Sequence, residues 1–544
     1  MKNKALYIKI GINFGVLVLV FFAFNYFLLV PYNLRLGSIW FYVAILILLP
    51  GSIMLMINIE AAKSYDREPK KLSKHSTISI LVGAGLILFY LIVSFFSTSV
   101  FNAERYYNLI GDVPEAIEFT NDFDAVDTES NLPVVDASLA AQLGDKEFGQ
   151  FGSLGSEFHV GEFHDLSVDG DLVAVAPLEF NGFFKWLNNR QGSPGYVVVN
   201  KTTGDVEVIT GLEMEYMPTA YFGQDLHRYL YKHGDNAKKY ELIDFALELD
   251  DDLNPYWVVS ALHPTIGFSG GKQVAGIYIV NPVNGEINFY TPENAPLWVD
   301  TVFPKEFVIN QLNYWGGLAD GWFNSILAQK NVIQTTSGTR RVYNDDRVYH
   351  YTGLTSASSD EATVGFIFVN TRTKEVVRYN MSGATETAAM DSAEGIVQNY
   401  GYYATFPIPM NVYNEPTFFI TLKDNKGLIK QYAFVNVSDF AIVGIGDSID
   451  SAYADYGEKL DDEHTIFYDE EDLTTIRGDV QRISMSVVDG TSQYEILIDD
   501  VLYIARYRIS SYLSLTEVGD EVILELLGDS VLTFVNVTIE GEPE

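Results

Sequence analysis

The sequence predicts a membrane-anchored α+β protein with three transmembrane helices, repeated hairpin-plus-helix modules and a small C-terminal β-barrel. Three observations lead to this prediction. The first hundred residues hold three long apolar stretches, a large acidic portion follows, and that portion repeats one strand–turn–strand pattern. We therefore expect five segments: a three-helix anchor over 1–100, an acidic connector over 101–165, an α+β ectodomain over 166–446, an acidic linker over 447–472 and the barrel over 473–544.

The anchor is predicted from Leu6–Leu29, Leu36–Ile57 and Ile78–Val100. About 20 apolar residues are needed to cross a bilayer as a helix, and each stretch reaches or approaches that length. None has a charged residue in its middle, and polar interruptions are few. Transport sites usually need ionisable groups inside the spans, so we expect an anchor rather than a transporter.

Basic residues near the apolar stretches predict the orientation. They lie before the first stretch and between the second and third, at Lys2, Lys4, Lys63, Arg67, Lys70, Lys71 and Lys74. Cytoplasmic loops carry the excess of Lys and Arg. We therefore expect the protein in the cell membrane, with a cytoplasmic N-terminus and with the residues after Val100 outside the cytoplasm.

Charge and cysteine usage limit the functions that the exterior can have. Residues 1–100 hold nine basic and three acidic side chains, which leaves 26 basic and 69 acidic side chains for the remainder. Such an acidic surface repels nucleic acid and attracts cations or basic partners. The chain has no cysteine, which excludes disulfides, thiol catalysis and thiolate metal sites. A bacterial cell envelope suits a large exterior without disulfides.

The repeat is the strongest internal signal. Gly195–Val206 matches Gly276–Ile287 and Gly365–Val376, each reading as Gly, four apolar residues, Asn, a turn, an acid and a second strand. This pattern is typical of a β-hairpin. Lys374 replaces the turn glycine in the third copy, so we expect that turn to differ or to be strained. Tyr432–Asn436 resembles a shortened fourth copy.

Helices are predicted between the hairpins. Thr219–His233 and Pro304–Leu327 carry apolar and aromatic residues at helical spacing, which is typical of core-facing helices. A short helix is predicted at Ala137–Leu143, with Asp136 as its N-cap and Gly144 as its C-terminal stop.

The second copy of the repeat resembles the PepSY domain. Asn254–Ser260 is an aromatic-rich strand, Gly276–Asn281 is an apolar strand, and Gly285–Ile287 completes the turn. In that family an Asp/Asn-x-x-Thr-Gly turn joins two such strands; this copy has Asn284 at the Thr position, whereas the first copy keeps Asn200, Thr203 and Gly204. The resemblance implies a non-catalytic envelope domain that restrains or binds peptidases or other partners.

The C-terminal barrel is predicted from five strands, at Thr475–Val488, Ser492–Ile498, Leu502–Ile509, Glu521–Leu527 and Leu532–Ile539. Five short strands in a small segment suit an OB-like barrel. This segment has no basic patch, so we expect a structural or protein-binding barrel and no nucleic-acid partner.

No catalytic or cofactor-binding residue is predicted, because no nucleophile elbow, phosphate loop or dinucleotide fingerprint occurs. The metal candidates are His159, Glu162 and His164. Calcium is the ion that acidic clusters would suit, and the chain has two such clusters: Glu248 with Asp250, Asp251 and Asp252, and Asp122 with Asp124 and Asp127. Candidate partner contacts are the aromatic residues Tyr256, Trp257, Trp298, Trp315 and Trp322.

Three functions follow from these features. The leading hypothesis is a non-enzymatic envelope protein that recognises or regulates a partner protein through its extracytoplasmic modules. The second is an extracytoplasmic hydrolase with a carboxylate-based site. The third is a surface protein that assembles with copies of itself. The expected partners are therefore membrane lipid and either another envelope protein or a second copy.

Overall fold

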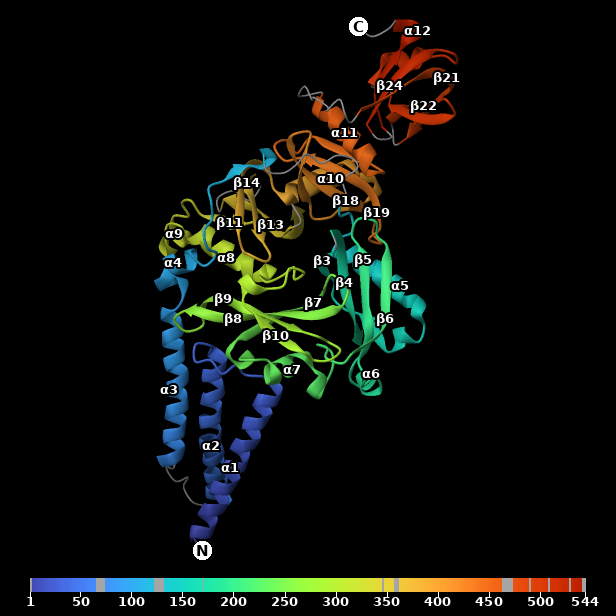
Figure 1. Ribbon diagram of the computed structural model, residues 1–544. Coiled ribbons are helices and arrows are strands. Elements are labelled where there is room, and N and C mark those ends of the chain that lie inside the picture. Colours follow the sequence, from blue (N-terminus) through green and yellow to red (C-terminus); the bar gives the residue numbers. More distant parts are fainter. Residues whose placement is uncertain are drawn as a thin grey trace.

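The computed structural model describes residues 2–64, 74–121, 132–168, 170–344, 347–356, 362–461, 473–488, 491–506, 509–527 and 530–540. Three N-terminal helices carry a stack of β modules, and a separate β unit lies at the far end from these helices (Figure 1). The α+β class predicted from the sequence is confirmed.

The N-terminal helices are α1 (Lys2–Phe27), α2 (Gly37–Ser64) and α3 (Lys74–Phe96). The sequence predicts three membrane crossings. Within the described residues, one helical segment, Thr77–Phe96, is long and apolar enough to span a membrane, with a mean hydropathy of 2.5. The apolar parts of α1 and α2 are shorter, at Phe14–Phe27 and Gly37–Ile53.

Four antiparallel modules follow, and each is one sheet. Module 1 consists of β2 (Phe158–Val160), β3 (His164–Val168), β4 (Asp171–Phe180), β5 (Ser193–Asn200) and β6 (Val206–Met214). Module 2 consists of β7 (Glu241–Leu249), β8 (Pro255–Ile266), β9 (Gly270–Val280) and β10 (Ile287–Tyr290). Module 3 consists of β11 (Ile333–Thr335), β12 (Arg340–Asn344), β13 (Arg347–Ser356), β14 (Ala362–Asn370) and β15 (Val376–Ala384), with β1 (Ile117–Glu118) parallel to β15. Module 4 consists of β16 (Tyr403–Ala404), β17 (Ile408–Val412), β18 (Glu415–Lys423), β19 (Ile429–Asn436) and β20 (Val443–Gly446).

The middle modules are buried on both faces. In module 2, Trp257 and Tyr278 belong to the core shared with module 1, whereas their neighbours Val258 and Ile277 belong to the core shared with module 3. Successive side chains of a strand point to opposite faces, so alternate residues serve different cores. This explains why the repeated strands are continuous apolar runs rather than alternating ones.

The same alternation continues one module further along the chain. In module 3, Phe366 and Phe368 pack against module 4, whereas Ile367 and Val369 pack against module 2. The modules are therefore stacked sheet against sheet through continuous hydrophobic cores.

The hairpin turns follow the repeat. The side-chain oxygens of Asn200, Asn281 and Asn370 each accept hydrogen bonds from the backbone N–H groups two and three residues ahead. Such local bonds stabilise a turn without help from the rest of the fold. In the shortened fourth copy, Asn436 accepts from the N–H of Asp439 at 2.8 Å.

The third turn does not differ in shape from the first two. The N–H of Lys374 donates to the carbonyl of Asn370 at 3.0 Å, as the N–H of Gly204 donates to the carbonyl of Asn200 at 2.9 Å. Lys374 has a φ of 63°, close to the 79° of Gly204 and the 74° of Gly285. A left-handed conformation costs a non-glycine residue about 1–2 kcal/mol, so of the two expected alternatives, a different turn or a strained one, the structure has the strained one.

The helices between α3 and the C-terminal unit are α4 (Ser99–Tyr107), α5 (Ala137–Phe148), α6 (Phe183–Asn188), α7 (Leu226–His233), α8 (Lys305–Leu318), α9 (Trp322–Leu327), α10 (Glu386–Ile396) and α11 (Ile449–Asp461). Asp136 caps α5 as predicted, because its carboxylate accepts from the N–H of Leu139 at 2.8 Å. Gly144 does not stop this helix. It is buried, and a Cβ there would stand 2.7 Å from the ring of Phe163, so it permits close packing instead.

Two of the predicted segments contain elements that pack on the neighbouring modules. The range 101–165 is not only a connector, since α5 packs on the core of module 1 and β2 belongs to its sheet. The range 447–472 is not an exposed linker over its described part. Helix α11 buries Ala452, Tyr456 and Leu460 against module 4, because these residues share one face at helical spacing.

The C-terminal unit has the five predicted strands: β21 (Leu473–Val488), β22 (Thr491–Ile498), β23 (Val501–Arg506), β24 (Glu521–Leu527) and β25 (Ser530–Asn536), with α12 (Val537–Glu540) after them. The sheet order is β23-β22-β21-β24-β25. No hydrogen-bonded ladder joins β23 to β25 in the described part of this unit, so the barrel is not closed. Closure requires a regular strand stagger, which the strand pattern of a sequence does not specify.

Specific polar contacts join module 2 to the N-terminal helices. The hydroxyl of Tyr231 donates to the carbonyl of Val30 at 2.6 Å, and the N–H of Ser269 donates to the carbonyl of Arg35 at 2.6 Å. Tyr90 of α3 shares a hydrogen bond of 2.8 Å with Ser269. The loop between α1 and α2 is thereby fixed against α7 and module 2.

Candidate functional site

A cavity of about 590 Å³ lies where all four modules meet. Module 1 contributes β3 and the residue after β5, module 2 contributes β7, and module 3 contributes β12 and β13. The first turns of α5 and α8 and Phe406 of module 4 complete the lining. The size is within the range of small-ligand and side-chain pockets in proteins.

Basic side chains in the cavity wall are already used by internal contacts. Lys201 forms an ion pair with Asp165, with Nζ 2.5 Å from Oδ2. Arg341 donates to the backbone carbonyl of Asp165 and to the hydroxyl of Thr301. Burial alone would raise the pKa of Asp165, but the charge and hydrogen bond of Lys201, together with Arg341, hold it below its usual value. The side chains of Lys201 and Arg341 therefore stabilise the cavity wall.

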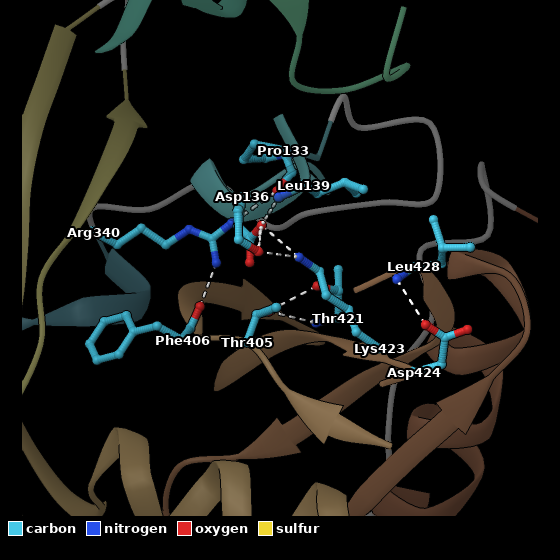
Figure 2. Close-up of polar contacts among 11 residues, drawn as sticks. Pro133, Asp136, Leu139, Arg340, Thr405, Phe406, Thr421, Lys423, Asp424 and Leu428 are labelled. Atoms are coloured by element: carbon cyan, nitrogen blue, oxygen red, sulfur yellow. Dashed lines mark hydrogen bonds and ion pairs between the residues drawn. The ribbon is translucent and has the colours of Figure 1, made fainter. Parts of the chain in front are cut away.

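A second cluster joins module 4 to α5. Lys423 and Arg340 lie on either side of Asp136 (Figure 2). The buried Lys423 donates to the Asp136 carboxylate at 2.5 Å, and Arg340 donates to the carbonyls of Phe406 and Pro133. Burial would raise the pKa of Asp136, yet the bond from Lys423 lowers it below its usual value. Asp136 is thus both the cap of α5 and the partner of a buried lysine.

Two histidines in the wall are neutral near physiological pH. Burial and then the charge of Arg341 lower the pKa of His164 to about 4 and that of His350 to about 3. Nε2 of His350 lies 3.0 Å from the carbonyl of Phe303 and must donate to it, which leaves Nδ1 as an acceptor. This buried Nδ1 has no hydrogen-bond partner among the described residues.

The solvent-exposed part of the lining is mainly acidic. Glu162, Asp244 and Glu306 are exposed and form no ion pair within the described residues, and Lys305 is the exposed base beside them. Protein surrounds Asp244 on most sides, and this burial raises its pKa above the usual value; Arg341 opposes the shift, whereas Glu162 and Glu306 add to it. The arrangement offers three carboxylates to a cationic group that enters from solvent.

Two further acids are buried together but do not line the cavity. Glu248 accepts from the N–H groups of Asp300 and Thr301, and Asp300 accepts from the N–H of Ser167 at 2.6 Å. Burial and then Asp300 raise the pKa of Glu248 to about 8, and burial raises that of Asp300 to about 6. Through these backbone contacts the pair joins modules 1 and 2 to the segment before α8.

The predicted metal residues are separated in the structure. Glu162 and His164 line the cavity, whereas His159 lies on β2 with Nε2 3.5 Å from the carboxylate of Glu179. No group of three His, Asp or Glu side chains suited to a metal ion occurs in the described part of the chain. The acids at 250–252 form a turn in which Asp250 accepts from the N–H of Asn254; Asp122, Asp124 and Asp127 lie outside the described residues.

The predicted aromatic residues lie away from the cavity. Trp257 is buried between modules 1 and 2 and donates to the carbonyl of Tyr216 at 2.9 Å. Tyr256 and Trp298 are half-buried with ring centroids 5.1 Å apart. Trp315 lies under the guanidinium of Arg378, and Trp322 packs against Phe323.

The sequence reasoning missed the basic residues of the wall, namely Lys201, Arg340, Arg341 and Lys423. One signal was present, since charged side chains at the ends of apolar strands are expensive to bury without partners. The partners themselves are distant: Lys423 and Asp136 are 287 residues apart. No protein-family model matches the chain, and no curated protein is similar to it.

Proposed function

We propose that the protein is an extracytoplasmic binding protein, anchored in the membrane, that holds a basic segment of a partner protein in the cavity between its modules. The observation that carries this proposal is the exposed trio of Glu162, Asp244 and Glu306, which form no ion pair with any described residue, above a wall whose bases are internally paired. The role agrees with the recognition function that the PepSY-like hairpins imply, and it is non-enzymatic.

Electrostatics support the choice of a basic partner. The chain carries a formal net charge of −37, and an acidic surface of this kind accelerates the encounter with cations. Inside the cavity, Nδ1 of His350 has no hydrogen-bond partner in the described part of the chain and is an acceptor that suits an ammonium or guanidinium donor. Long-range attraction and local acceptors therefore favour the same class of ligand.

The anchor in this proposal consists of α1, α2 and α3, with the modules outside the cytoplasm. Large apolar side chains on these helices are exposed, among them Phe14, Phe22, Leu81, Leu88 and Phe95. Exposed apolar side chains of this size are stable in lipid and costly in water. The basic residues between the second and third apolar stretches support the orientation.

The hydrolase hypothesis receives less support from the same geometry. The carboxyls with the most strongly raised pKa values, Glu248 and Asp300, hold backbone N–H groups and do not line the cavity. A general acid must reach its substrate. Protein recognition is therefore the function that the cavity supports best.

The test is chemical crosslinking in native membranes, followed by purification and mass spectrometry. The full chain is compared with a variant carrying Glu162→Gln, Asp244→Asn and Glu306→Gln. We expect one reproducible partner, crosslinked through basic residues, whose yield falls at least tenfold in the variant. The loss of three carboxylates removes the attraction for its cationic segment.

A matched control changes the same number of charges elsewhere, through Asp251→Asn, Asp252→Asn and Glu293→Gln, all at exposed positions. The control should capture the partner as well as the unmodified chain does. Equal loss in both variants would show a general charge effect and contradict a role for the cavity. Crosslinks only between copies of the chain would favour self-assembly instead.

A further inference from the structure

An exposed aromatic patch lies on module 1, remote from the cavity. Helix α6 and the turn at Phe222–Gln224 present four apolar side chains to solvent: Phe184, Leu187, Tyr221 and Phe222, with exposed fractions of 75, 44, 37 and 53%. Phe183 and the buried Trp186 pack beneath them, with ring centroids 5.7 Å apart. Contiguous apolar patches on soluble surfaces mark interaction sites.

The patch is joined directly to the end of α1. Nη1 of Arg228 donates to the carbonyl of Phe222 at 2.8 Å, and Nε of the same residue donates to the carbonyl of Tyr26 at 3.1 Å. Its guanidinium lies 4.4 Å from the centre of the Tyr26 ring. Phe222 is therefore one side chain away from the end of α1, and α6 lies at the side of module 1 that is nearest to the helices (Figure 1).

The backbone at Phe222 is held in a costly conformation. Its φ is 57°, in the left-handed region that few non-glycine residues adopt. The bond from Arg228 fixes this turn and leaves the Phe222 ring largely exposed. Strain retained at an exposed aromatic residue is typical of a binding surface.

Basic side chains lie near the same end of α1 as the patch. The segment 225–239 carries three exposed lysines, Lys232, Lys238 and Lys239, whereas the Arg228 side chain is largely buried and forms an ion pair with Asp225. The N–H of Tyr32 and the amide of Asn33 donate to the carbonyls of Lys238 and Lys239, which places both lysines beside the loop after α1. Arg190 covers the Trp186 ring at 4.5 Å. In an exterior where acids greatly outnumber bases, this collar is complementary to phosphate headgroups.

We propose that the patch inserts into the headgroup region of an anionic lipid bilayer, with Phe184, Leu187 and Phe222 in the outer acyl boundary and the basic collar on lipid phosphates. The inference rests on the proposed function, because it requires α1–α3 to cross that bilayer. Aromatic and basic residues are the side chains that favour a membrane interface. Module 1 then has a second attachment, which fixes the cavity above the membrane.

The test uses nitroxide labels, because the chain has no cysteine of its own and each introduced cysteine is labelled uniquely. Single variants Phe184→Cys and Leu187→Cys of the full chain are reconstituted in vesicles of phosphatidylglycerol and phosphatidylcholine. Collision rates with lipid-soluble oxygen and with a water-soluble nickel complex are measured. We expect an oxygen-to-nickel ratio at least fivefold above that of Val518→Cys, an exposed position in the C-terminal unit.

A label at Leu88→Cys, on α3, separates the two possible failures. If Leu88 is in lipid while positions 184 and 187 match position 518, the patch proposal is wrong and the anchor stands. If position 88 is also in water, the anchor itself is wrong. Spin–spin broadening at 184 that disappears on dilution with unlabelled chain would show a second copy on the patch and overturn lipid contact. An unchanged ratio in phosphatidylcholine alone would overturn the role of the basic collar.

Discussion

The buried charged side chains of this protein form their ion pairs and hydrogen bonds with residues that are far away in the sequence. Glu162 and His164 were predicted as candidates because they are close in sequence, and both do line the cavity. The sequence does not indicate Arg341 as a site residue, because its role depends on contacts with Thr301 and with the backbone of Asp165. Local spacing thus indicated part of the site. The remainder depends on how the modules stack, which no local pattern encodes.

The buried acid pair predicts a pH dependence of stability at the residue scale. The pKa of Asp300 is raised from 3.8 to about 6, so its contribution to stability is full below pH 3.8 and is lost as the pH rises through 6. Asp300→Asn keeps an acceptor for Ser167 and removes the charge that helps to raise the pKa of Glu248. We expect the variant to lose less thermal stability than the unmodified chain between pH 4.5 and 7, by roughly 1.4 kcal/mol for each unit of pKa shift removed.

This difference is measured by thermal unfolding of the full chain in detergent at both pH values. Asp252→Asn, at an exposed turn, serves as the control and should keep the pH dependence of the unmodified chain. Parallel pH profiles for all three proteins would show that the pair is not protonated in the folded state.

At the scale of elements, the hairpins were predictable because their information is local. The glycine that opens each copy marks a strand bend against its neighbour, where a Cβ at Gly365 would collide with the carbonyl of Tyr379. The turn asparagines use bonds within three residues. The predicted helix over Pro304–Leu327 is instead two helices, because Gly321 adopts a φ of 83° between them. A helical stripe of apolar residues does not reveal such a break.

The turn lysine of the third hairpin gives a prediction for that element. Nζ of Lys374 donates to the carbonyl of Leu109 and to the side chains of Gln273 and Gln311, at 2.9, 3.1 and 3.2 Å. Lys374→Gly relieves about 1–2 kcal/mol of left-handed strain. It also leaves the side-chain oxygen of the buried Gln311 without its donor, at about 1–3 kcal/mol, whereas the carbonyl of Leu109 keeps the hydrogen bond from Gln273. We therefore expect net destabilisation of up to about 2 kcal/mol, measured by urea unfolding of the full chain.

The comparison for this prediction is Lys426→Gly, at an exposed turn position outside the repeat hairpins, which should change stability by less than about 0.5 kcal/mol. If Lys374→Gly were stabilising, the backbone strain at Lys374 would outweigh its hydrogen bonds to α8, β9 and the segment after α4.

At the scale of the whole molecule, the stacking of the modules explains why the sequence contains continuous apolar runs. Apolar runs such as Phe366–Val369 mark strands buried on both faces, and this predicts neighbouring sheets on either side. The order of the stack was not predictable, because each sheet offers two similar faces. Closure of the C-terminal barrel was predicted from strand number alone, and strand number does not determine closure.

The clasp between Lys423 and Asp136 ties the last module of the stack to the first helix of module 1, and it gives the final prediction. Lys423 is fully buried, so Lys423→Met leaves the Asp136 carboxylate without its buried cation. Breaking one side of a buried pair costs about 3–5 kcal/mol. The exposed pair of Lys430 and Asp424, with atoms 3.6 Å apart, lies on the same module, and Lys430→Met should cost less than about 1 kcal/mol.

Hydrogen exchange distinguishes a clasp between modules from a contact that is important only locally. In the full chain with Lys423→Met, we expect faster exchange both in α5 and in β18–β19, because the lost bond joins these two elements. In Lys430→Met both should exchange as in the unmodified chain. Faster exchange confined to module 4 would mean that the ion pair stabilises its own sheet, and that the hydrophobic cores alone hold the stack together.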